Sequence, residues 1–245
     1  MIRLSVNVNK VATLRNARGG DRPSVRQAAE VAIAAGCHGI TVHPRPDERH
    51  IRRADVLALA AWLPVELNIE GYPGDEWLRL VERVRPAQAT LVPDPPDVLT
   101  SNAGWRFGEV DRVWLVGIVA RLRAAGCRVS LFVDPVPREV EGAKSVGADR
   151  VELFTEAYAR AFATKKRDAV FARYRAAAER AAALGLGVNA GHDLDLDNLP
   201  YLAQNLPGLA EVSIGHALIG DALFAGLDRT VRAYLAALAA DRPQP

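Results

Sequence analysis

Eight short apolar runs that alternate with Ala- and Leu-rich helical segments predict an α/β protein folded as one (β/α)8 TIM barrel with extra helices. A second observation is that helical segments repeatedly end in Gly just before a strand, at 34–37, 124–127, 145–149 and 183–187. The third is size, because 245 residues with 49% hydrophobic side chains suit one barrel of this kind. We therefore expect a single domain over residues 1–245.

The strand candidates are short and rich in β-branched or apolar residues. Most of them lack a strict alternation of polar and apolar residues, which is typical of strands buried on both faces. They are Leu4–Val8, Gly39–Val42, Val65–Ile69, Ala89–Val92, Arg128–Val133, Arg150–Leu153, Gly187–Ala190 and Glu211–Ile214.

Helices fill most of the connections between these strands. Residues 24–35 are one helix, with Ser24 and Gln27 spaced as a capping box, and Asp75 is placed as the N-cap of another. The segment 155–185 is too long for one barrel helix and predicts an extra helix before the usual one. Residues 93–111 predict a long lid or binding loop, and Arg15 belongs to a Gly-rich loop after the first strand.

Composition limits the partners and the compartment. A net charge of +2 and 24% charged residues give no case for nucleic-acid binding. Two cysteines, Cys37 and Cys127, indicate buried thiols in a reducing compartment. Because no signal-peptide pattern and no membrane-spanning run is present, we expect a cytoplasmic protein that does not bind a membrane.

Histidine and glutamate cluster where strands should end, and in a barrel these ends meet on the face that carries the chemistry. Proton transfer near neutral pH favours His and tuned carboxylates, so we expect an acid/base site there. Glu152 lies inside a strand, and a structural ion pair with Arg150 or Arg160 is its alternative role. The others are His43, His50, Glu70, His192 and His216.

Phosphate binding is indicated by the pairs Gly191-His192 and Gly215-His216, which open the loops after the seventh and eighth strands. The aspartates of 193–197 do not fit a calcium loop, since Asn198 stands at its glycine position. No Cys/His cluster has zinc-site spacing, and a His/Glu metal site at the barrel mouth is the weaker alternative.

Seven stretches over nearly the whole chain resemble the pyridoxine 5′-phosphate synthase family, which acts last in the deoxyxylulose-dependent route to vitamin B6. The resemblance implies condensation of 3-amino-2-oxopropyl phosphate with 1-deoxy-D-xylulose 5-phosphate to pyridoxine 5′-phosphate, phosphate and water. It also implies a homo-octamer and no metal or organic cofactor. The stretches are ATLRNARG at 12–19, GITVHPRPDERHI at 39–51, LNIEGYP at 67–73, LVPDPP at 91–96, VSLFVD at 129–134, VNAGHDL at 188–194 and IGHALIG at 214–220.

The same resemblance implies roles for individual residues. His43 and Glu70 match proton acceptors, His192 a proton donor, and Glu152 a carboxylate that stabilises a transition state. Matches to ligands of the aminoketone phosphate are Asn7, Arg18 (for a neighbouring subunit's site), Asp193, Gly215 and His216. Matches to contacts of the deoxysugar phosphate are Arg45, His50 and Thr100, and Asn9 and Lys10 stand at two further substrate-binding positions.

This chain departs from the common family pattern at three places. Asn9-Lys10 replaces Asp-His, Asp193 replaces Gly, and Ser213 replaces Asn. Asn9 can hydrogen-bond a sugar hydroxyl but cannot act as a base, and Lys10 adds a fixed positive charge. One alternative function is another phosphate-sugar barrel enzyme, an isomerase or an aldolase with Lys10 as the Schiff-base residue. The other is a binding protein without turnover.

Overall fold

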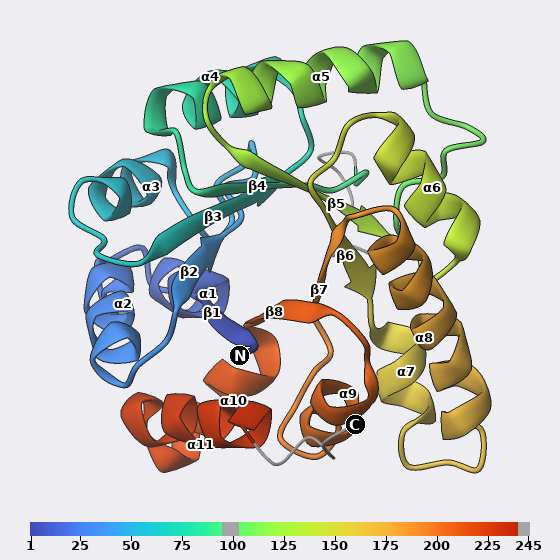
Figure 1. Cartoon of the computed structure of the whole chain (residues 1–245). Coiled ribbons are helices and arrows are strands. Elements are labelled where there is room, and N and C mark those ends of the chain that lie inside the picture. The colour runs from blue at the N-terminus through green and yellow to red at the C-terminus, as the bar shows by residue number, and fades with distance from the viewer. Residues whose placement is uncertain (95–102, 240–245) are drawn as a thin grey trace.

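The computed structural model describes residues 1–94 and 103–239, and within them eight parallel strands close a barrel in chain order (Figure 1). The predicted fold class is confirmed. Thr100 and the middle of the predicted 93–111 loop lie outside the described residues. The strands are β1 Arg3–Asn7, β2 Gly39–Val42, β3 Glu66–Gly71, β4 Gln88–Leu91, β5 Arg128–Val133, β6 Arg150–Phe154, β7 Gly187–Gly191 and β8 Leu209–Ile214.

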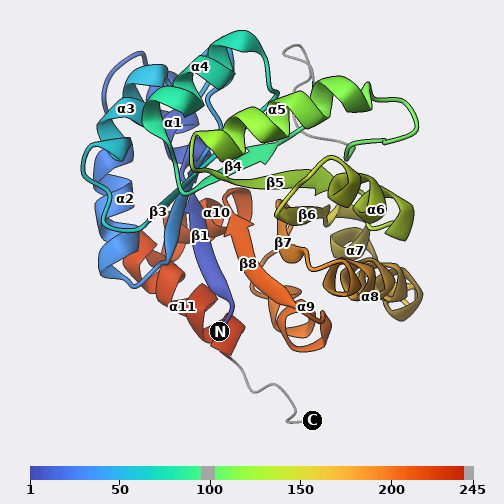
Figure 2. The same cartoon turned by 45° about the horizontal axis from the view of Figure 1, so that its top comes forward.

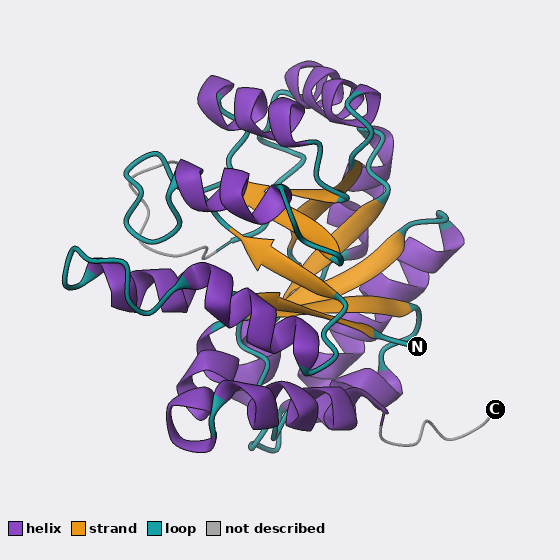
Figure 3. Ribbon diagram, turned by 90° about the vertical axis from the view of Figure 1, so that its left-hand side faces the viewer, coloured by secondary structure: helices purple, strands orange, loops and turns teal. Residues whose placement is uncertain are grey.

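Helices surround this barrel on the outside (Figure 3). The extra helix predicted within 155–185 is confirmed, since α7 precedes α8 there. The helices are α1 Asn9–Asn16, α2 Val25–Ala34, α3 Arg53–Ala60, α4 Asp75–Val84, α5 Arg112–Ala124, α6 Pro137–Ser145, α7 Glu156–Ala161, α8 Arg167–Ala183, α9 Leu199–Asn205, α10 His216–Ala225 and α11 Leu227–Ala239. None of the described helices is long and apolar enough to cross a membrane.

The helix ends largely agree with the N-caps and the terminal glycines that the sequence predicted. Ser24 caps α2, where its hydroxyl accepts a hydrogen bond from the Gln27 backbone N–H at 3.2 Å. At α4 the N-cap is Gly74, one residue before the predicted Asp75. The four predicted glycine exits all have a positive φ, between 70° and 104°, which a Cβ would strain: Gly36, Gly126, Gly147 and Gly185.

The assignment of Arg15 to a Gly-rich loop was wrong, because residues 9–16 form α1. The Asn7 side chain accepts a hydrogen bond from the Asn9 backbone N–H at 3.0 Å, so it satisfies a donor at the start of this helix. The first glycine comes only at Gly19, after the helix has ended. Arg15 is therefore held on a rigid element, where it is 4% exposed.

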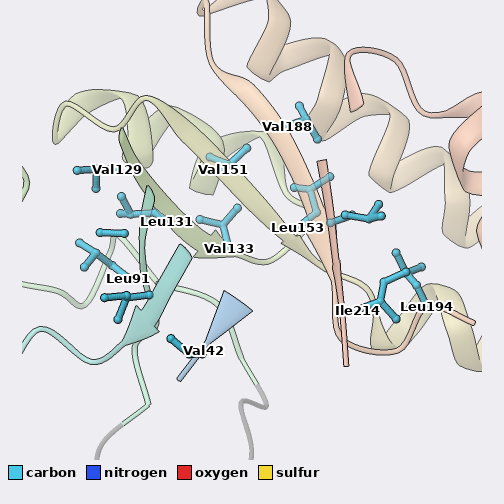
Figure 4. Packing of buried hydrophobic residues seen from close by; sticks show 14 of the residues in the cluster. Val42, Leu91, Val129, Leu131, Val133, Val151, Leu153, Val188, Leu194 and Ile214 are labelled. Carbon is cyan, nitrogen blue, oxygen red and sulfur yellow. The ribbon is translucent and has the colours of Figure 1, made fainter. Parts of the chain in front are cut away.

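The prediction that the strands are buried on both faces is confirmed, because their residues are mostly buried whichever way they point. Apolar residues such as Leu131, Val151 and Ile214 point outward and form the core between the strands and the helices (Figure 4). The residues between them point inward and are largely polar, for example Ser5, Asn68 and Glu152. Polar and apolar residues alternate with a period of two in RLSVN, ELNIE and RVELF, so the polar set of each strand shares one face.

The inward direction follows from contacts between strands that are not neighbours. Gln88 of β4 donates to Glu211 of β8 at 3.1 Å, and Asn189 of β7 donates to Gln88 at 3.3 Å. Arg128 of β5 pairs with Glu66 of β3 at 2.5 Å. Such pairs can meet only through the barrel interior. These polar and charged side chains fill the amino-terminal end of the barrel, and we call them the amino-terminal plug. Most of the predicted site residues lie at the opposite, carboxyl-terminal end.

Helices α10 and α11 complete the ring after β8. Helix α11 packs against α2, α9 and α10 and so joins the end of the described chain to its beginning (Figure 2). This closure places the N-terminus of α10 directly after β8, at the same end of the barrel as the end of β1.

Candidate active site

The carboxyl ends of the strands bring most of the predicted site residues together. Two His–carboxylate pairs stand among them. His43 Nδ1 lies 4.0 Å from Glu70 Oε2, and His192 Nδ1 lies 3.7 Å from Glu152 Oε1. In each pair the histidine follows one strand and the glutamate belongs to another. The barrel therefore builds each pair from residues that are 27 or more positions apart in the sequence.

The Glu70–His43 pair is buried. Glu70 is 2% exposed, and burial raises its pKa to about 8, with the charge of Glu211 acting in the same direction. Burial, together with the neighbouring His50 and Arg45, holds the pKa of His43 well below its usual value. At neutral pH the pair therefore consists of a protonated carboxyl beside a neutral imidazole. Such a pair can both accept and donate a proton.

Hydrogen bonds hold this pair in position. Asn7 Nδ2 lies 3.5 Å from Glu70 Oε2, at the limit of a hydrogen bond. The indole N–H of Trp77 donates to the Glu70 carbonyl at 3.0 Å, and Gly71 is required because a Cβ there would overlap the Trp77 ring. The Asn9 side-chain oxygen accepts from the His43 backbone N–H at 2.9 Å. Asn9, which follows β1, thus fixes the position of His43, which follows β2.

The Glu152–His192 pair joins the ends of β6 and β7. Glu152 is fully buried, and both of its carboxyl oxygens lack a hydrogen-bond partner among the described residues. Burial raises the pKa of Glu152 far above its usual value, and Glu70, when it is ionised, raises it further. Burial also lowers the pKa of His192 to about 4. The pair therefore holds its proton on the carboxyl, next to a neutral imidazole.

Local backbone geometry permits this second pair. A Cβ on Gly191 would lie 2.6 Å from the Ser213 carbonyl and 2.9 Å from Glu152 Oε1, so only glycine fits. His192 itself has φ 70°, which turns its ring toward the Phe132 ring at a centroid distance of 4.9 Å. A positive φ in a residue other than glycine is strained and is often found at functional sites.

The alternative role of Glu152 in a structural ion pair is wrong. Arg150 pairs with Glu211 at 3.5 Å, and Arg160 pairs with Glu156 at 2.5 Å. Arg150 and Glu152 lie two residues apart on β6 and both point inward, but at different depths in the barrel. The strand rise therefore places Arg150 in the amino-terminal plug and Glu152 near the mouth.

A cationic cluster flanks His43. The His50 ring stands 6.1 Å from the His43 ring, centroid to centroid, and its Nδ1 accepts from the Ile51 backbone N–H at 2.9 Å. Burial, then the charges of Arg45 and Lys10, lower the pKa of His50 to about 4. Arg45 is 5% exposed and lines a pocket with His43 and Tyr72. This side of the mouth suits an anionic ligand.

The other predicted phosphate residues are Gly215 and His216 at the N-terminus of α10 and Asp193 in the loop after β7. Gly215 precedes the helix, and a Cβ there would stand 3.0 Å from the Asn7 Cβ. His216 is the first helical residue and is exposed, as is Asp193, whose carbonyl accepts from Asn198 Nδ2 at 3.1 Å. Backbone N–H groups at a helix N-terminus favour an anion.

Two predicted residues are not brought into the site by the described structure. Arg18 lies in the turn after α1 with its side chain exposed, and Thr100 lies outside the described residues. Sequence reasoning overlooked Arg15 and Asn16, which contact the His50 backbone. Their position in the ATLRNARG stretch was a signal that we had used only for Arg18. Among residues 1–94 and 103–239, no three His, Cys, Asp or Glu side chains are grouped to hold a metal ion.

Known proteins similar to this chain identify the family to which it belongs. Residues 4–240 match the family model described as "Pyridoxal phosphate biosynthesis protein PdxJ". A pyridoxine 5′-phosphate synthase of Cytophaga hutchinsonii is 54% identical over 235 residues, which cover 96% of this chain and 98% of that protein. One from Porphyromonas gingivalis is 55% identical over 236 residues, with the same two coverages.

Solved structures with low sequence identity share the fold alone. A tryptophan synthase structure from M. tuberculosis has a TM-score of 0.65 at 14% identity, covering 97% of this chain and 92% of that one. An aldolase for 4-hydroxy-2-oxoglutarate has a TM-score of 0.61 at 19% identity, covering 96% and 93%. On the evidence of the family match and of relatives above 50% identity, the chain belongs to the PdxJ family of pyridoxine 5′-phosphate synthases.

Proposed function

We propose that this chain condenses 3-amino-2-oxopropyl phosphate with 1-deoxy-D-xylulose 5-phosphate to form pyridoxine 5′-phosphate, releasing phosphate and water. The observation that carries the proposal is the presence of two buried His–carboxyl pairs in one barrel mouth. A ring-forming condensation requires several proton transfers, and two separate pairs supply separate donors and acceptors. Membership of the family supports phosphorylated small molecules as the substrates.

We assign the aminoketone phosphate to the α10 side of the mouth. Its phosphate would accept hydrogen bonds from the backbone at Gly215 and His216 and from the Asp193 N–H, with Asn7 beside it. Arg18 is exposed on the surface and would serve a neighbouring subunit's site.

We assign the deoxysugar phosphate to the cationic side. Arg45, His50 and Lys10 would hold its phosphate, together with Thr100 of the loop after β4. Asn9 uses its amide oxygen on the His43 N–H, so its amide nitrogen is the group that would reach a sugar hydroxyl. In this assignment Asn9 both binds substrate and positions His43.

The Glu70–His43 pair would act first. The amine attacks the ketone carbon of the deoxysugar, and the resulting carbinolamine loses water to form a Schiff base. His43, which is neutral, accepts a proton from the nitrogen, and the Glu70 carboxyl donates one to the leaving hydroxyl. A cationic amine nearby would lower the pKa of Glu70, so that its carboxylate can then serve as the second acceptor.

The Glu152–His192 pair would act as the proton donor of later steps. His192 alone is poorly suited to this, because burial keeps it unprotonated. Glu152 holds the proton 3.7 Å away and can pass it to His192 Nδ1 when an anionic substrate raises the pKa of the imidazole. The anionic form of Glu152 would then stabilise the positive charge on the ring.

The aldolase alternative has less support. A Schiff-base aldolase places its lysine at a strand end, and the four lysines of this chain all lie elsewhere: Lys10, Lys144, Lys165 and Lys166. Lys10 lies in the first turn of α1, beside the mouth. Borohydride trapping with a keto-phosphate would give a covalent adduct on Lys10 if this chain were such an aldolase.

We also propose that the chain acts as one domain in a cytoplasmic homo-octamer. A groove between α1, α2 and α10 is lined by apolar side chains, and three large ones near it are strongly exposed: Leu14 at 53%, Leu223 at 68% and Phe224 at 94%. Exposed apolar side chains grouped in this way are typical of a protein–protein interface. Contact between copies of the chain at this face would also bring Arg18 toward a neighbouring site.

The test is to mix the purified protein with both phosphorylated substrates and follow pyridoxine 5′-phosphate by absorbance and mass. Product formation that is lost in Glu70→Gln supports the proposal. Tight binding of both substrates without any product would refute it and favour another reaction on phosphorylated sugars.

A further inference from the structure

A partly buried hydrogen-bond network joins α1 to the loop between β2 and α3. Arg15 stands at its centre with 4% of its surface exposed. Its Nη1 and Nη2 donate to the two carboxylate oxygens of Asp55 at 2.6 and 2.9 Å. Its Nε donates to Asn16 Oδ1 at 3.0 Å.

The network ends on the backbone of His50. Arg15 Nη2 donates to the His50 carbonyl at 3.1 Å, and Asn16 Nδ2 donates to the same oxygen at 2.8 Å. Asn16 Nδ2 also reaches the Glu48 carbonyl at 3.2 Å. Two donors on one carbonyl, from neighbouring residues of a rigid helix, fix the orientation of the peptide plane that follows His50.

The next peptide N–H then orients the imidazole. Ile51 N–H donates to His50 Nδ1 at 2.9 Å, so the neutral ring carries its hydrogen on Nε2. The ring stands beside His43. The network thus controls both the position of the His50 ring and the nitrogen that it offers to a ligand.

Stability alone is a weak reason for such a network. Removing a guanidinium and a carboxylate from water costs free energy that their mutual attraction only partly returns, and apolar side chains of similar volume often stabilise as well. A planar guanidinium supplies what apolar packing does not, namely several donors in a rigid arrangement. Arg15 uses that arrangement on Asp55, Asn16 and His50 at once.

We propose that Arg15 and Asn16 are positioning residues that hold His50 ready to bind the phosphorylated deoxysugar. The inference rests on the proposed function, because it assigns His50 to that substrate. It predicts that substitutions of Arg15 and Asn16 weaken the binding of one substrate only. Neither residue would touch the aminoketone phosphate, which is assigned to the α10 side of the mouth.

The experiment compares Asn16→Ala and Arg15→Lys with wild type and with Arg128→Lys as a matched control. Arg128 is a partly buried arginine that pairs with Glu66 in the amino-terminal plug. Asn16→Ala removes a carbonyl donor without leaving a buried charge, so it is expected to fold. Lysine at position 15 keeps the charge but cannot bind Asp55, Asn16 and His50 together.

Both α1 variants should raise KM for 1-deoxy-D-xylulose 5-phosphate by roughly tenfold, while KM for the aminoketone phosphate changes less than about twofold. The Arg128→Lys control should change neither KM value. Nitrogen-15 NMR of the substrate-free protein should show His50 Nδ1 unprotonated in wild type and a mixture of tautomers in Asn16→Ala.

Equal changes in both KM values, or none in either with an unchanged His50 tautomer, would overturn the positioning role. Absence of product from the wild type would instead refute the proposed function. In that case the NMR comparison would still test whether the network orients His50.

Discussion

Replacing Glu70 by Gln should stabilise the folded protein while it abolishes turnover. The carboxyl of Glu70 is buried, and its pKa is raised from the usual 4.5 to about 8. Between these two values the folded state holds a proton that the unfolded state releases. The free energy of unfolding therefore falls as the pH rises from about 4.5, and the loss is complete above about 8.

The size of this loss in the free energy of unfolding follows from the shift in the pKa of Glu70. One pKa unit corresponds to about 1.4 kcal/mol, so the ionisable Glu70 costs under about 1 kcal/mol at pH 5, about 3 kcal/mol at pH 7 and about 5 kcal/mol at pH 9. Glutamine has nearly the same shape and cannot ionise. The variant should therefore gain these amounts over wild type at the same three pH values.

Urea unfolding at pH 5, 7 and 9, at one protein concentration, measures the difference between the two proteins directly. Titrating groups that do not interact with Glu70 contribute equally to both proteins and cancel in that difference. A stability difference that stays constant from pH 5 to 9 would show that Glu70 ionises normally in the folded state. The proton-donor role assigned to its carboxyl would then be wrong.

Gly191→Ala should destabilise the protein by about 1–3 kcal/mol, because its Cβ would lie 2.9 Å from Glu152 Oε1, and thermal unfolding measures this. Gly220→Ala, with open space around the new Cβ on α10, should instead stabilise it by up to about 1 kcal/mol; equal effects would contradict the packing argument. His192→Asn should lower kcat by roughly 10²–10⁴-fold in steady-state kinetics with little change in either KM, and an unaltered kcat would remove His192 from the mechanism. Phe224→Ser should shift the assembly toward smaller species in analytical ultracentrifugation, since it removes a 94% exposed ring from the proposed interface; an unchanged sedimentation profile would place the interface elsewhere.

Local patterns in the sequence were enough to predict the fold. The four glycine exits were recognisable because a positive φ at a helix end is a local requirement that glycine meets best. His43, Glu70 and His192 were recognisable as site residues because every strand of a parallel barrel ends on the same face. For Glu152 the sequence left two directions open, into the barrel or toward the helices, although the alternation in RVELF is compatible with an inward-facing carboxylate.

The partner of each site residue was decided by tertiary structure. Glu152 lies beside His192, and Arg150, two residues away on the same strand, pairs with Glu211 at the other end of the barrel. Such pairings depend on the closure of eight strands and on the depth of each side chain, which no local pattern contains. The raised pKa of Glu70 has the same origin, because burial arises only when the surrounding strands have closed around the carboxyl. The sequence thus determined which residue types stand at the mouth, and the closed barrel decided which of them share a proton.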